Sequence, residues 1–291
     1  MNQDRQAIAF GLAAVALWST VATAFKVALA FMTPLELMWI AALVSWALMG
    51  ALVVKRGLLT QALSGWKTAA WAGLMNPVAY YLVLFAAYDR LPGQEAMALN
   101  YTWGLTMALL AVPILGQRLA LKDLAAGCVA YAGVWVIATR GQVLNVNFED
   151  PLGVALALAS TLIWALYWLL NTRDAREPLV GQWQNFSVGL PILTVLLLLG
   201  PGFTWHGPAA LGAGVYVGLF EMGIAFIFWQ LAVHRVSRTA KVTNLIFLSP
   251  PVSLLLLHVV VGEPLMMSTF IGLALILIGL GCQQLIRHNK A

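Results

Sequence analysis

Two stretches of this sequence resemble each other although they lie 145 residues apart: AGLMNPVAYYLVLFAAYDR (72–90) and VGLFEMGIAFIFWQLAVHR (217–235). When they are aligned, Gly73 lies opposite Gly218, and the same order of apolar and polar residues follows in both. Self-similarity at a fixed offset is the sequence signature of an architecture built from repeated units. The pair therefore predicts a chain made of two similar halves.

The similarity continues beyond these stretches. GQRL (116–119) aligns with GEPL (262–265) when the offset grows by one residue. We predict two five-helix repeats, residues 1–145 and 146–291, which together form one domain. Chance similarity among apolar segments is the alternative, and the shared glycines and polar positions argue against it.

The composition is that of an integral membrane protein. Of the 291 residues, 62% are hydrophobic and 9% are charged, and the mean hydropathy is +0.87, far from the values of a soluble domain. The net charge of +5 comes from basic residues in ones to threes between apolar runs. Nucleic-acid binding needs a basic face instead, so we expect a lipid bilayer around the chain and no nucleic acid.

Ten apolar windows are long enough to span a membrane as helices, which takes roughly 20 residues each. They are 6–29, 34–54, 68–88, 96–115, 121–139, 151–170, 179–199, 209–233, 239–261 and 265–286. The links between them are short, so no soluble domain is expected. We predict an all-α membrane protein with ten transmembrane helices.

The basic residues predict the direction of these helices. Cytoplasmic loops are enriched in Lys and Arg, and with ten spans 13 of the 16 basic residues fall on one side and 3 on the other. Both termini are therefore expected in the cytoplasm. Because five is an odd number, the two repeats should lie in opposite orientations, which is a common plan of secondary transporters.

The ten spans, the repeat and the GEPL turn (262–265) followed by two glycines resemble the EamA-like branch of the drug/metabolite transporter superfamily. ALWS (16–19), Asn76–Pro77 and NYTW (100–103) are most similar to the YddG-type aromatic amino acid exporters within it. The resemblance covers nearly the whole chain. It implies a basket-like bundle around a central cavity built by the first, third, fourth, sixth, eighth and ninth helices, with the fifth and tenth packed together.

Interruptions of the helical pattern point to the same cavity. Pro77 and Gly223 lie at matched positions of the two repeats, and Gly104 matches Pro250 and Pro251 within a residue. A proline frees a carbonyl that lipid cannot satisfy, and paired interruptions are a pointer to a transport site. We predict these five residues as hinges; static packing kinks are the alternative.

Polar and aromatic side chains within the spans supply the candidate binding site. Glu221 and Asn76 are repeat equivalents, and an ionisable residue inside a membrane usually faces the interior of the bundle. Interhelical bonding or packing is the plainer explanation for each amide and ring. The predicted substrate-binding residues are Trp18, Asn76, Tyr80, Asn100, Tyr101, Trp103, Trp164, Trp168, Glu221 and Asn244.

These features predict a secondary transporter that exports amino acids, aromatic or large apolar ones, across the inner membrane by alternating access. A multidrug or other small-metabolite exporter is the alternative. No nucleotide-binding, metalloprotease or serine-hydrolase motif occurs in the sequence, so we expect no enzyme activity, cofactor or metal. Protons are a candidate coupling ion through Glu221. We expect a functional monomer, although Ala126, Ala130, Gly272 and Gly279 suit packing within one chain as well as a dimer contact.

Overall fold

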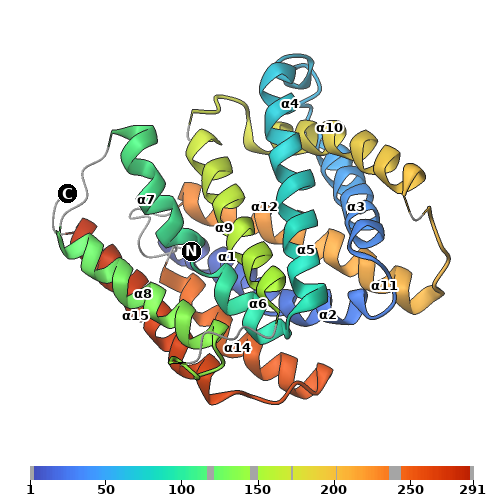
Figure 1. Cartoon of the computed structure of the whole chain (residues 1–291). Helices are drawn as coiled ribbons and strands as arrows, with labels where there is room; N and C mark the ends of the chain where they lie inside the picture. The colour runs from blue at the N-terminus through green and yellow to red at the C-terminus, as the bar shows by residue number, and fades with distance from the viewer. Residues whose placement is uncertain are drawn as a thin grey trace. The chain divides into compact units, whose positions relative to one another are not determined.

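The computed structural model describes residues 3–116, 121–144, 150–171, 173–200, 202–235 and 244–288 (Figure 1). The described residues form helices and contain no strand. The chain divides into two compact units, unit 1 (Met1–Phe85 and Asp174–Val261) and unit 2 (Ala86–Arg173 and Gly262–Ala291). Each unit therefore combines helices from both predicted repeats.

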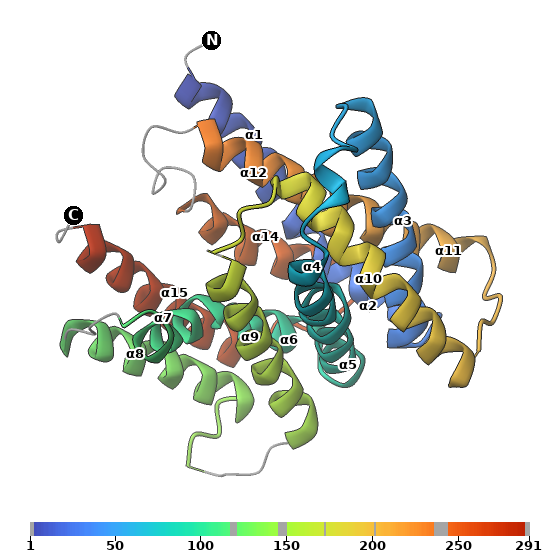
Figure 2. The same ribbon diagram turned by 90° about the horizontal axis from the view of Figure 1, so that it is seen from above.

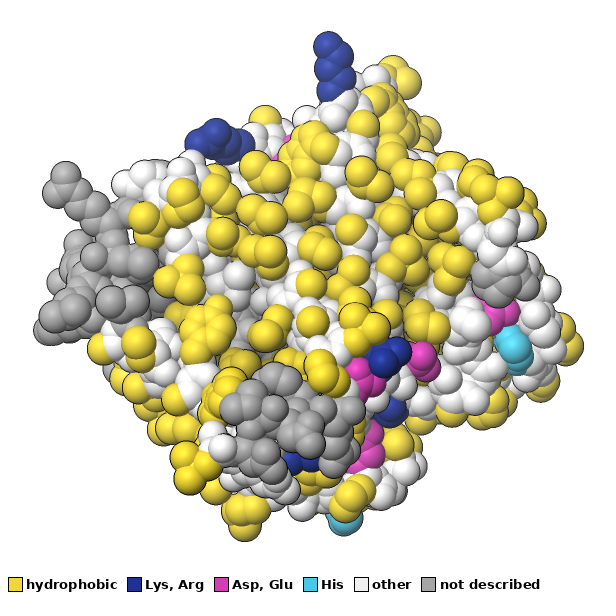
Figure 3. All heavy atoms as spheres, viewed as in Figure 1, with side chains coloured by type: hydrophobic (Ala, Val, Ile, Leu, Met, Phe, Trp, Pro, Cys, Tyr) yellow, Lys and Arg dark blue, Asp and Glu magenta, His cyan; other side chains and the backbone are white. Residues whose placement is uncertain are grey.

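Seven helical segments of the described residues are long and apolar enough to cross a membrane. They are Gln3–Leu29, Pro34–Lys55, Trp66–Arg90, Gly93–Ile114, Pro151–Asn171, Pro178–Leu199 and Pro208–Trp229. Shorter apolar helices, Ala125–Ala138, Ser249–Val261 and Met267–Cys282, occupy the three remaining predicted windows. Hydrophobic side chains predominate on the face drawn in Figure 3. The chain is a multi-pass membrane protein, while the count of ten spans and the cytoplasmic termini stay predictions.

Unit 1 is built around two long helices that lie side by side, α3 and α10 (Figure 2). The helix α3 begins at the predicted residue, and α10 begins one residue before the predicted window. Thr33 and Glu36 cap the first turn of α3 reciprocally, and Pro34 and Pro178 occupy the opening turns of the two helices, where a proline costs no hydrogen bond. The elements of unit 1 are α1 (Gln3–Ser19), α2 (Val21–Leu29), α3 (Pro34–Lys55), η1 (Gln61–Leu63), α4 (Trp66–Gly73), η2 (Leu74–Ala79), the start of α5 (Tyr80–Arg90), α10 (Pro178–Leu199), α11 (Pro208–Tyr216), η3 (Val217–Ile224), α12 (Ala225–Arg235), η4 (Asn244–Leu248), α14 (Ser249–Leu256) and η5 (Leu257–Val261).

The paired interruptions predicted in the third and eighth helices are present as π-helical segments. The segment η2 contains Pro77 and the segment η3 contains Gly223. Ser45 of α3 donates a 2.6 Å hydrogen bond to the carbonyl of Gly218 within η3. A neighbouring hydroxyl thus satisfies a backbone group where the α-helical ladder is disturbed, as an apolar environment requires.

Repeat-equivalent glycines pack in equivalent ways on the two central helices. A Cβ at Gly73 would collide with the carbonyl of Asn185 on α10, and a Cβ at Gly218 would lie 2.7 Å from the carbonyl of Ala41 on α3. Each glycine therefore allows a close approach of two backbones. This correspondence supports the predicted repeat, because the same contact recurs at both of its copies.

Unit 2 contains a tightly packed pair of helices, α8 and α15, which run side by side (Figure 1). A Cβ at Gly133 of α8 would collide with the carbonyl of Gly272 on α15, and one at Gly279 would lie 2.6 Å from the carbonyl of Ala126. These small residues therefore serve packing within the chain. The elements of unit 2 are the end of α5, α6 (Gly93–Asn100), α7 (Trp103–Leu115), α8 (Leu121–Ala138), α9 (Pro151–Asn171) and α15 (Met267–His288).

Candidate functional site

Glu221 lies in the π-helical segment η3 of unit 1 and is 9% exposed. The hydroxyl of Tyr81 donates a 3.2 Å hydrogen bond to its Oε1 atom. Its Oε2 atom has no hydrogen-bond partner among the described residues. A buried carboxyl with a free oxygen can bind a cationic group or carry a proton.

Asn76 lies at the corresponding break of the third helix. Its backbone angles, φ −140° and ψ 111°, are extended rather than helical. The residue before a proline is disfavoured in the α region, and Pro77 follows directly. The Asn76 side chain is completely buried, and both of its amide atoms are without a partner in the described part of the chain.

Tyr81 is the main residue of this region that sequence reasoning missed. We predicted Tyr80 because it lies four residues after Asn76, one turn of an α-helix. A π-helical turn is wider by about one residue, so the neighbouring tyrosine, Tyr81, meets Glu221 instead. The Tyr80 ring packs edge-on against the Tyr81 ring, with centroids 4.8 Å apart.

Trp18 belongs to the same unit and packs among aromatic rings. Its ring centroid lies 5.8 Å from that of Phe226 and 5.2 Å from that of Trp229, both on α12. The helix then breaks at Thr20, between α1 and α2. This break was not predicted, because no glycine or proline marks it.

Unit 2 holds the other predicted residues. Asn100, the last residue of α6, donates a 3.0 Å hydrogen bond to Ser160 of α9. One turn further along α9, Trp164 stacks on Tyr167, and its centroid lies 5.7 Å from that of Trp168. The interhelical role that was the plainer explanation for Asn100 is therefore present.

The remaining predicted residues lie at helix junctions. Tyr101 caps the end of α6, and Trp103 and Gly104 begin α7, so the fourth helix breaks two residues earlier than predicted. Pro250 and Pro251 lie in the first turn of α14, where they start a helix after the short η4. Asn244 begins η4, and its side chain lies outside the described residues, as do Gln117 and Arg118 of the GQRL turn.

Two further carboxylates, those of Glu36 and Glu263, form hydrogen bonds that connect a helix to a segment linking two other helices. Glu36 of α3 accepts a 3.1 Å hydrogen bond from the amide of Thr204 and lies 3.0 Å from Nε2 of His206. In unit 2, Glu263 of the GEPL turn accepts hydrogen bonds of 2.7 and 3.2 Å from the amides of Gly93 and Gln94. These amides open α6, where a negative charge also complements the helix dipole.

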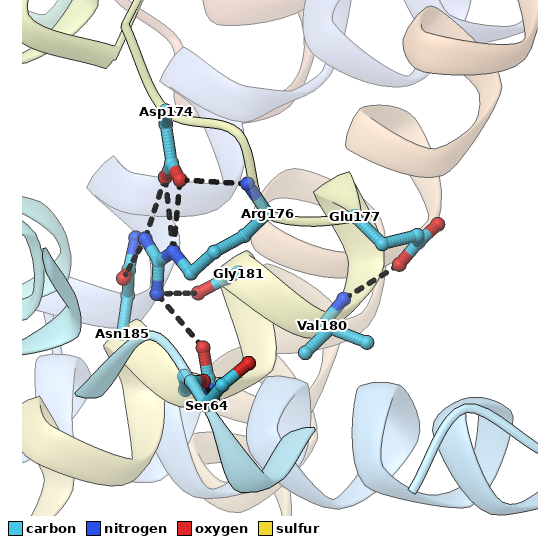
Figure 4. Close-up of polar contacts among 8 residues, drawn as sticks. Ser64, Asp174, Arg176, Glu177, Val180, Gly181 and Asn185 are labelled. Atoms are coloured by element: carbon cyan, nitrogen blue, oxygen red, sulfur yellow. Dashed lines mark hydrogen bonds and ion pairs between the residues drawn. The ribbon is translucent and has the colours of Figure 1, made fainter. Parts of the chain in front are cut away.

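Arg176 organises the start of α10 (Figure 4). It forms a 2.7 Å ion pair with Asp174 and donates to the side chains of Gln184 and Asn185. Gln184 in turn donates to the carbonyl of Ser64, ahead of α4. Burial raises the pKa of Asp174, but hydrogen bonds from the Arg176 side chain and backbone and its charge lower the pKa more, so the net shift is downward.

Among the described residues, no group of three or more His, Cys, Asp or Glu side chains lies close enough to hold a metal ion. The buried unpaired polar atoms of η2 and η3 belong to Asn76 and Glu221.

Known proteins resemble this chain in sequence and in fold. The chain is 29% identical over 205 residues to a protein of Streptantibioticus cattleyicolor named "Probable terminal-alkyne amino-acid exporter". The aligned region covers 67% of this chain and 65% of the exporter's length. It is also 23% identical over 269 residues, 90% of this chain and 86% of the other, to the uncharacterized transporter YvbV of Bacillus subtilis. One solved crystal structure superposes with a TM-score of 0.69 at 24% identity, over 98% of this chain and 99% of the other.

The family model of EamA-like transporters matches the chain twice, at residues 5–139 and 151–282. One match lies within each of the two predicted repeats. They also place the chain among transporters rather than enzymes. The chain belongs to the EamA-like transporter family.

Proposed function

We propose that this protein exports amino acids with aromatic or large apolar side chains across the inner membrane by alternating access. The observation that carries the proposal is the buried Glu221 carboxyl in η3, with one oxygen free and the other held by Tyr81. A free carboxylate oxygen is a suitable partner for an α-ammonium group. The relative named as an amino-acid exporter supports the same substrate class.

The two central helices give the proposed movement a scaffold. The helix α4 packs on α10 and the helix α11 packs on α3, each ahead of a π-helical segment. In the proposed movement, the helices after the breaks, α5 and α12, tilt relative to the helices before them, α4 and α11. Pro77 and Gly223 lie within these breaks and keep their proposed role as hinges.

Glu221 also suits coupling to protons. A carboxyl that loses its proton when a substrate ammonium arrives would exchange one cation for the other. In proteoliposomes, Glu221→Gln should transport amino acids more slowly and with a weaker dependence on the pH gradient. An unchanged rate together with an unchanged pH dependence would refute the coupling role.

The test of the substrate class is uptake of a panel of labelled amino acids by proteoliposomes, with and without a pH gradient. We expect tryptophan, phenylalanine, leucine and their like to enter faster than aspartate, lysine and glycine. Lipophilic cations are the competing substrate class, because aromatic rings with a carboxylate also attract them. Uptake of such cations without uptake of any amino acid would favour the multidrug alternative.

A further inference from the structure

Six side chains of unit 1 present a buried polar atom that has no hydrogen-bond partner among the described residues. Gln182 and Trp183 lie within α10, and the other four are Thr23, Asn76, Glu221 and Ser249. Their exposed fractions are 8%, 0%, 9% and 1%. Buried polar groups nearly always have partners, and each exception needs an explanation. Glu221 and Asn76 were expected from the sequence, whereas Thr23 and Ser249 were not.

The four residues share a structural position, because each lies at a discontinuity of a different membrane helix. Thr23 is in the first turn of α2, just after the break at Thr20, and Ser249 is the first residue of α14. Asn76 and Glu221 lie in the π-helical segments η2 and η3. Irregular backbone at membrane depth is tolerated where it is buried in protein or lines a cavity.

Contacts within unit 1 connect these discontinuities. The helix α2 packs against both η3 and α14. Phe25 of α2 contacts Phe85 of α5 with ring centroids 4.6 Å apart, and Tyr81 of the same α5 bonds Glu221. The four unpaired groups therefore come from segments that are tied to one another through α2 and α5.

The end of α1 is fixed to α14 in the same region. The hydroxyl of Ser253 donates a 2.7 Å hydrogen bond to the carbonyl of Ser19, and both residues are 2% exposed. Ser249 lies one helical turn before Ser253, on the same side of α14. The hydroxyl of Ser253 thus has a partner at the end of α1, while the hydroxyl of Ser249 has none among the described residues.

We infer that Thr23, Asn76, Glu221 and Ser249 form the subsite for the α-ammonium and α-carboxylate groups of the exported amino acid, an inference that rests on the proposed function. The Glu221 oxygen accepts from the ammonium. The Asn76 amide and the two hydroxyls donate to the carboxylate. Recognition then demands both charged groups of the substrate, because an analogue that lacks one leaves buried polar groups unpaired.

Competition for transport in proteoliposomes tests whether recognition requires both charged groups of the substrate. The labelled probe is the best-transported amino acid of the panel, and the competitors keep its side chain while lacking one group. For tryptophan they are tryptamine and indole-3-propionate, and for leucine they are isoamylamine and 4-methylpentanoate. We expect each analogue to compete at least about tenfold more weakly than the parent amino acid.

Two variants separate binding from stability. Thr23→Val and Ser249→Ala should each raise the half-saturating substrate concentration about threefold to tenfold. They should leave the melting temperature unchanged or raise it, because they remove an unpaired buried hydroxyl. The matched control is Thr194→Val on α10, whose hydroxyl donates to Leu190 and accepts from Trp39. That change should lower the melting temperature and leave half-saturation unchanged.

The possible failures are distinguishable. If the wild type transports amino acids but the analogues compete as well as the parent, the subsite is refuted and the proposed function stands. The same holds if Thr23→Val and Ser249→Ala behave like Thr194→Val, the pattern of purely structural hydroxyls. If the wild type transports no amino acid, both the function and the subsite are wrong.

Discussion

The hydroxyl of Tyr81 donates a 3.2 Å hydrogen bond to Glu221, 140 positions further along the chain. This bond joins α5, just beyond the π-helical segment η2, to the π-helical segment η3 within unit 1.

A double-mutant cycle should detect this bond. Tyr81→Phe leaves Oε1 of Glu221 unpaired and should lower the free energy of unfolding by about 1–3 kcal/mol. In the Glu221→Gln background, Tyr81→Phe should lower the free energy of unfolding by a smaller amount, because the hydrogen-bonded pair is already altered. We expect a coupling energy between the two substitutions of about 0.5–3 kcal/mol. Denaturant unfolding in detergent measures all four proteins. Strictly additive effects would mean that the two side chains do not interact.

The repeat-equivalent glycines should be equally sensitive to a methyl group. Gly73→Ala and Gly218→Ala each place a Cβ against the backbone of a neighbouring helix, and each should destabilise the protein by about 1–3 kcal/mol. Gly212→Ala on α11 is the matched control, since nothing lies within 4 Å of its added Cβ. It should stabilise the helix by about 0.5–1 kcal/mol. Thermal unfolding of the three variants checks the contrast.

Glu263 should anchor the GEPL turn to the start of α6. Glu263→Gln replaces a carboxylate that accepts hydrogen bonds from two backbone amides. The substitution should lower the free energy of unfolding by about 1–3 kcal/mol. The exposed Asp89 offers a control, because Asp89→Asn should change the stability by less than about 0.5 kcal/mol. Equal melting temperatures for the two variants would contradict the anchoring role.

Asp174 should make stability depend on acid pH. The pKa of its carboxyl is lowered in the folded protein, chiefly because the hydrogen bonds from Arg176 outweigh the effect of burial. Its contribution is then fully present above the unfolded pKa of about 3.9 and is lost as the pH falls through the folded-state pKa. The melting temperature of the wild type should exceed that of Asp174→Asn at pH 7, and the difference should shrink only below about pH 4. A difference in melting temperature that stayed constant down to pH 3 would show that the ion pair with Arg176 contributes nothing to the stability.

Hydropathy and self-similarity predicted much of the fold. Apolar length is a local property, so the boundaries of helices such as α3 and α9 follow from composition and from the prolines that begin them. The break in the third helix was visible because Pro77 cannot complete an α-helical ladder. The break at Thr20 was not visible, because no glycine or proline marks it. The carbonyl of Ser19 at this break accepts a hydrogen bond from Ser253, which is distant in sequence.

The candidate site was predicted less completely than the fold. Glu221 and Asn76 could be identified because a charge or an amide within an apolar run is costly and therefore conspicuous. Thr23 and Ser249 could not, because hydroxyls in membrane helices are common and usually bond to their own backbone. Only the structure shows which of them lack a partner.

By itself, the sequence determined that this chain is helical, embedded in a membrane and repeated, because these properties depend on the residues of each segment and on their comparison with one another. The tertiary structure decided which residues meet. Tyr81 rather than Tyr80 reaches Glu221 because a π-helical turn shifts the register by about one residue. Gly73 and Gly218 are required because two long helices, α3 and α10, pack against the breaks at backbone distance.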